Sequence, residues 1–118
     1  RDFTYIDDLV EGVVRLMGKA PVEGAPVGPM DSLSPAAPWR AVNIAGGQPV
    51  GLLAYVDAVE QALGAPVRRK FVEMQKGDVP ATFASAALLE ALTGYMPATQ
   101  VETGVAHFVR WYREYYGV

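Results

Sequence analysis

The stretch Arg1-Asp2-Phe3-Thr4-Tyr5-Ile6-Asp7-Asp8 opens the sequence and decides the predicted fold. Its aromatic and β-branched residues favour a short strand over residues 3–6. Asp8, followed three residues later by Glu11, has the spacing of a helix N-cap. The helix itself is indicated by apolar residues at helical spacing and by a glycine that ends them: Leu9, Val10, Val13, Val14, Met17 and Gly18. Because this strand and helix begin without an initiator Met or a leader, we expect the chain to be the tail of a longer protein.

The remaining elements are predicted from the same two signals, apolar residues at helical spacing and short runs of β-favouring residues. Apolar spacing and terminal glycines predict helices over residues 52–63, 85–92 and 101–115. Short β-rich runs predict further strands at 41–44, 67–74 and 81–84. The sequence therefore predicts an α/β chain of about four helices with three or four short strands. Since so small a sheet buries little apolar surface, most of the sheet is expected outside these residues.

Residues 19–40 differ from the rest of the chain. They show no periodicity and hold five of the nine prolines. We interpret them as a Pro/Gly-rich irregular loop inserted into one domain that covers residues 1–118.

Composition limits the possible functions. The chain has 118 residues, a hydrophobic fraction of 51% and a net charge of −3, which fit one globular domain and disfavour nucleic acid as a partner. It has no cysteine, which excludes disulfides, thiolate metal sites and a cysteine nucleophile. No apolar run approaches the roughly 20 residues that span a bilayer, so we expect no membrane partner. The cytoplasm is the default expectation for its location.

Three segments carry a resemblance to a known family: residues 1–8 (RDFTYIDD), 42–46 (VNIAG) and 74–82 (MQKGDVPAT). In this order and at this spacing they resemble the C-terminal part of NAD-dependent nucleotide-sugar epimerases and dehydratases, which are extended short-chain dehydrogenases/reductases. The ending, residues 108–116 (FVRWYREYY), is most similar to the UDP-glucuronate 4-epimerase branch.

The resemblance implies a reaction and separate binding roles for two parts of the parent enzyme. The parent enzyme would oxidise a UDP-sugar reversibly at C4 with NAD, and this portion would hold the UDP half. A missing N-terminal Rossmann domain would bind NAD, and the whole is expected to form a homo-oligomer. This chain has no G-x-G-x-x-G after a strand and no Tyr-x-x-x-Lys pair, so alone it is expected to bind no NAD and to catalyse nothing. Another nucleotide-sugar epimerase or dehydratase, and a non-catalytic α/β binding module, remain as alternatives.

Four residues form the predicted substrate site, with no catalytic residue and no metal ligand. Arg1 is expected to hold the pyrophosphate, because its planar fork suits a phosphate. Asp78 resembles the acid that binds the ribose hydroxyls, although it could instead close a turn before Pro80. Phe3 could line the nucleotide pocket or be an ordinary buried strand residue. Gln75 stands where some relatives carry Arg, which leaves phosphate binding more dependent on Arg1.

Other polar residues are assigned structural roles or none. Asp7 and Asp8 are interpreted as capping residues rather than as a carboxylate pair for catalysis or metal binding. His107, the single histidine, has no partner in the sequence pattern and receives no role.

Overall fold

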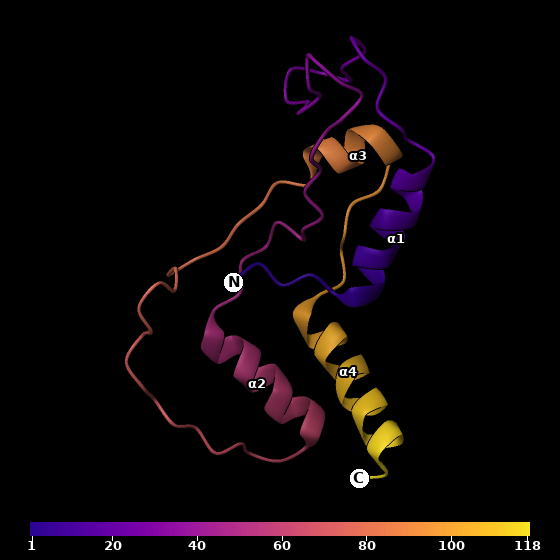
Figure 1. Ribbon diagram of the computed structural model, residues 1–118. Coiled ribbons are helices and arrows are strands. Elements are labelled where there is room, and N and C mark those ends of the chain that lie inside the picture. Colours follow the sequence, from indigo (N-terminus) through magenta and orange to yellow (C-terminus); the bar gives the residue numbers. More distant parts are fainter.

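The computed structural model describes residues 1–118 and shows four helices joined by long irregular segments (Figure 1). Their bounds are Ile6–Met17 for α1, Leu52–Leu63 for α2, Ala87–Thr93 for α3 and Val101–Tyr116 for α4. All four correspond to helices expected from the sequence. Gly64 and Gly94 end α2 and α3 in the left-handed conformation, with φ of 72° and 68°, which glycine adopts without steric cost.

The predicted α/β class is wrong, because the structure contains helices and no strand. Residues 41–44, 67–74 and 81–84 have no partner strand. Of 47 backbone–backbone hydrogen bonds, 32 lie within the helices, and the nearest approach to a ladder is an isolated pair between Arg1 and Val50. High β-propensity reports how well a side chain fits a pleated surface with cross-strand neighbours. This chain offers those segments no such neighbours.

Two helix starts also differ from the prediction. The carbonyl of Tyr5 accepts the N–H of Leu9 at 3.0 Å, so α1 begins at Ile6 and includes the last residue of the expected strand and the expected cap at Asp8. Asp8 therefore lies inside the first turn of the helix and is not its N-cap. α3 begins at Ala87, two residues after the predicted start at residue 85.

The helices pack as two pairs (Figure 1). α2 lies against α4, where Ala58, Val105 and Val109 form a small buried cluster. α1 lies against α3, where a glycine of α1 approaches the fully buried Leu89. Only 9 of the 118 residues are buried, so both cores are thin.

Long connections occupy the outside of the molecule. The chain between α2 and α3 swings away from the helices and returns, and the connection between α1 and α2 forms a lobe beyond α3 (Figure 1). Within that lobe, the Asp31 carboxylate accepts the N–H groups of Val27 and Leu33 and pairs with Arg40. None of the helices combines the length and apolar character that crossing a membrane requires.

Candidate functional site

Arg1 and Asp78 lie together in the structure, although 77 positions separate them in the sequence. Arg1 Nη2 forms an ion pair with Asp78 Oδ1, and the two side chains are 35% and 50% exposed. Such an exposed pair is worth about 0–1 kcal/mol, so a ligand can displace or share it at little cost. Guanidinium has five N–H donors, which leaves further donors of Arg1 available to an anion.

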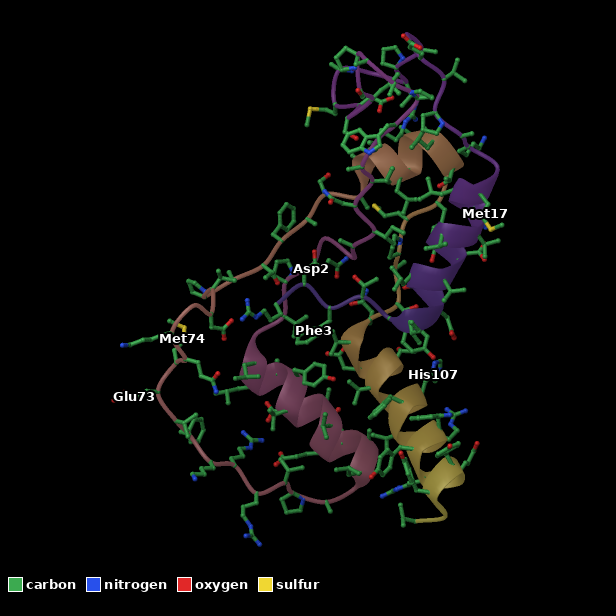
Figure 2. All side chains as sticks on the ribbon, viewed as in Figure 1. Asp2, Phe3, Met17, Glu73, Met74 and His107 are labelled. Carbon is green, nitrogen blue, oxygen red and sulfur yellow. The ribbon has the colours of Figure 1, made fainter.

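Gln75 lies in the same loop as Asp78 but does not reach Arg1 with its side chain. Its carbonyl accepts the N–H of Asp78 at 3.1 Å, and Gly77 between them has a φ of 90°. Asp78 Oδ1 also accepts the N–H of Val79 at 3.0 Å. Asp78 therefore forms part of a turn, as one of the two interpretations predicted, and also pairs with Arg1. Figure 2 shows the preceding residues of this loop, Glu73 and Met74, on its outer side, far from the helices.

Phe3 is held by an aromatic neighbour rather than by a sheet. Its ring stacks on that of Tyr55 in α2, with centroids 4.4 Å apart and planes inclined by 22°. The ring is partly exposed, two residues along the chain from Arg1. The same ring lines a larger cleft.

That cleft has a volume of about 540 Å³ and lies between residues 3–7, Tyr55 and the first turns of α4. Phe3 lines it, whereas Arg1, Gln75 and Asp78 do not. Its lining contains no arginine or lysine, so a phosphate would find no cation there. We therefore place the candidate phosphate site at Arg1 and regard the cleft as an adjoining apolar surface.

A polar contact crosses this cleft. The hydroxyl of Tyr5 lies 3.3 Å from Nδ1 of His107, which is exposed on α4 (Figure 2). Desolvation of the Tyr5 phenol, together with the nearby carboxylate of Asp7, raises its pKa. His107 thus has a partner that the sequence pattern did not indicate.

Asp2 is the site residue that sequence reasoning missed. Its carboxylate accepts the N–H groups of Gly47 and Ala84, and its own N–H donates to Thr82 Oγ1. Its place between Arg1 and Phe3 is the signal that could have drawn attention to it. A carboxylate with a buried oxygen needs either a cation or hydrogen-bond donors, and here it has two backbone donors.

The residues present do not fit NAD. The glycine-rich turn at Gly46 and Gly47, ahead of α2, is the part that most resembles a pyrophosphate loop. No strand precedes it, and the N–H of Gly47 is bonded to the Asp2 carboxylate, which would repel a pyrophosphate. The structure also has no cluster of three or more His, Asp or Glu side chains that could hold a metal ion.

No family model matches the chain. Individual proteins match it over nearly its whole length, and several of them are named as epimerases of a nucleotide sugar. A "Probable UDP-glucuronate 4-epimerase" of Rhizobium meliloti is 56% identical over 98% of the chain, which corresponds to 35% of that protein. "UDP-glucuronate 4-epimerase 1" of Arabidopsis thaliana is 42% identical over 99% of the chain and 27% of its own length.

"Protein CapI" of Staphylococcus aureus is 40% identical over 98% of the chain, which corresponds to 35% of that protein. The chain spans about a quarter to a third of the length of these curated relatives. The resemblance to part of a nucleotide-sugar epimerase or dehydratase is therefore confirmed, and proteins named UDP-glucuronate 4-epimerase are prominent among the relatives.

Proposed function

We propose that this chain is the substrate-binding part of an NAD-dependent epimerase that acts at C4 of a UDP-sugar, with UDP-glucuronate as the substrate. The observation that carries the proposal is the Arg1–Asp78 pair. It brings a planar cation and a carboxylate side by side on the surface, two residues along the chain from Phe3. These are the chemical groups that a diphosphate, a ribose and a nucleobase require.

Each residue has a distinct role in this proposal. Arg1 binds the pyrophosphate through the donors that Asp78 leaves free. Asp78 accepts the ribose hydroxyls, for which a carboxylate has two suitable oxygens. Phe3 offers an apolar ring face to the nucleotide, and Gln75 contributes an uncharged donor on the phosphate side. The four residues grip the nucleotide half, so the sugar stays free to turn.

The chemical step belongs to the rest of a longer protein. NAD would supply hydride transfer at the sugar carbon, and this chain has neither the loop nor the Tyr-x-x-x-Lys pair for it. The relatives are about three times as long, which leaves length for a dinucleotide-binding domain. We propose that such a domain covers the apolar face of α1 and that the whole protein forms a homo-oligomer.

The test uses the longer protein that carries this chain. Arg1→Ala should weaken UDP-sugar binding by ten- to a hundredfold, because hydrogen bonds to charged groups are worth about 1.5–3 kcal/mol. Asp78→Ala should weaken it somewhat less, since water can replace part of its role. Arg1→Lys keeps the charge but loses the fork, so it should fall between wild type and Arg1→Ala.

Calorimetric titration with UDP and with NAD separates the two ends of the site. NAD affinity should stay unchanged in all three variants. Arg68→Ala, which removes an exposed arginine that makes no ion pair, is the matched control and should bind UDP normally. Normal UDP affinity in both Arg1→Ala and Asp78→Ala, with circular dichroism showing folded protein, would overturn the proposal.

A further inference from the structure

Asp2 connects three parts of the chain that are distant in the sequence (Figure 2). Oδ2 of its carboxylate accepts the N–H of Gly47 at 3.1 Å and the N–H of Ala84 at 3.3 Å. Its own N–H donates to Thr82 Oγ1 at 3.1 Å. One residue thereby fixes the start of the chain, the turn ahead of α2 and the segment ahead of α3.

The same connection fixes the backbone from which Arg1 extends. The Arg1 nitrogen donates to the carbonyl of Val50, and the N–H of Val50 donates to the carbonyl of Arg1, both at 2.8 Å. Val50 lies three residues beyond Gly47, so the bonds of Asp2 and Arg1 hold one short stretch of chain at two points. The guanidinium is therefore carried by a backbone that has few ways to move.

The position of Asp78 depends on Asp2 through the hydrogen bond between Asp2 and Thr82. Between residues 70 and 81, the Arg1–Asp78 pair is the only hydrogen bond or ion pair to the rest of the molecule. The loop returns to the body at Thr82, four residues beyond Asp78, where Thr82 Oγ1 accepts the N–H of Asp2. Four residues reach at most about 14 Å, so Asp78 stays within that distance of Thr82 as long as the Asp2 bond holds Thr82 in place.

The Asp2 carboxylate also has an oxygen whose burial is unfavourable for stability. Oδ1 of Asp2 is buried and has no hydrogen-bond partner. A buried acceptor without a hydrogen-bond partner lowers the stability of the folded chain. A carboxylate kept at such a cost, adjacent to Arg1, indicates that its geometry serves the neighbouring site.

We propose that Asp2 is the positioning residue of the nucleotide site: it sets the spacing between the guanidinium of Arg1 and the carboxylate of Asp78 so that one ligand reaches both. This rests on the proposed function, and it assigns Asp2 no contact with the substrate. Loss of Asp2 should release both side chains at once, whereas loss of either partner removes only one.

The first experiment is titration of the longer protein with UDP. Asp2→Ala should weaken UDP binding by about tenfold and raise KM for the UDP-sugar, while kcat at saturation changes little. Asp2→Asn keeps one acceptor oxygen for the two N–H groups and should restore most of the affinity. Asp8→Ala is the matched control, because the Asp8 carboxylate also accepts two distant backbone N–H groups, those of Ala98 and Thr99.

A double-mutant cycle separates positioning from a general loss of stability. In the Asp78→Ala background, Asp2→Ala should weaken UDP binding clearly less than in wild type, because one of the two groups that it positions is already absent. Additive losses, or a loss from Asp2→Ala no larger than that from Asp8→Ala, would overturn the inference. If Arg1→Ala itself leaves UDP binding unchanged, the proposed function fails; if Arg1→Ala weakens binding and Asp2→Ala does not, only the role of Asp2 fails.

Discussion

The structural role of Asp8 differs from the helix-capping role that the sequence predicts. Instead of capping α1, its carboxylate accepts the N–H groups of Ala98 and Thr99, at 3.2 and 2.8 Å, and the hydroxyl of Tyr95 at 3.1 Å. Desolvation alone would raise the pKa of Asp8, but these hydrogen bonds outweigh it and hold the pKa below its usual value of 3.8. Asp8 therefore ties α1 to the segment that leads into α4.

The lowered pKa of Asp8 gives a pH-dependent prediction. The contribution of Asp8 to stability is fully present above the unfolded pKa near 3.8 and is lost as the pH falls through the lower folded pKa. At pH 7, Asp8→Ala should lower the free energy of unfolding by about 1–3 kcal/mol. The difference from wild type should shrink as the pH falls below 3.8, as urea titrations at several pH values will show. Asp7→Ala, which removes an exposed acid from the same turn, is the control; an equal loss there would contradict the role of Asp8.

At the scale of the element, α1 packs through its one buried residue, Gly12. A Cβ at Gly12 would lie 3.1 Å from Cγ2 and 3.3 Å from Cδ1 of Ile44, closer than ordinary side-chain contacts. Gly12→Ala should therefore destabilise the chain: overpacking costs about 1–3 kcal/mol, against about 1 kcal/mol gained in helix propensity.

Gly18→Ala is the matched control for Gly12→Ala. Gly18 follows the same helix, has a φ of −87° and would present its Cβ to open space. It should change the free energy of unfolding by less than about 0.5 kcal/mol in urea titration. A stability gain in Gly12→Ala would show that α1 shifts away from Ile44 without loss.

Among the elements, the sequence predicts the helices correctly and the strands incorrectly. Helices were predictable because apolar spacing and terminal glycines such as Gly64 and Gly94 are local signals. Strands were not, because residues 67–74 have β-propensity but no neighbouring strand, and pairing is a property of the whole fold. The site divides in the same way: the resemblance singled out Arg1 and Asp78, whereas the bonds of Asp2 to Gly47 and Ala84 depend on tertiary structure.

At the scale of the whole molecule, the chain is more open than its size requires. Its accessible surface is 8632 Å² for 12.7 kDa, whereas a compact monomer of that mass has roughly 6,200 Å². Its radius of gyration is 18.0 Å, against about 13–14 Å for a compact domain of this length. The excess surface includes a continuous apolar stripe on α1, whose members are 38–79% exposed: Ile6, Leu9, Val10, Val13, Val14 and Met17.

A stripe of this kind predicts self-association of the chain when it is produced by itself. Contiguous exposed apolar surface is seldom left uncovered in a monomer, so the weight-average mass in sedimentation equilibrium should rise with concentration. The double substitution Val10→Glu and Met17→Glu places two charges on the stripe and should keep the chain monomeric. Val22→Glu with Met30→Glu adds the same charges at similarly exposed positions outside the stripe, and this variant should associate like wild type. A wild-type chain that stays monomeric at high micromolar concentration would contradict the prediction. In the longer protein, the α1 variant should instead lower stability, because we propose that the stripe is covered there.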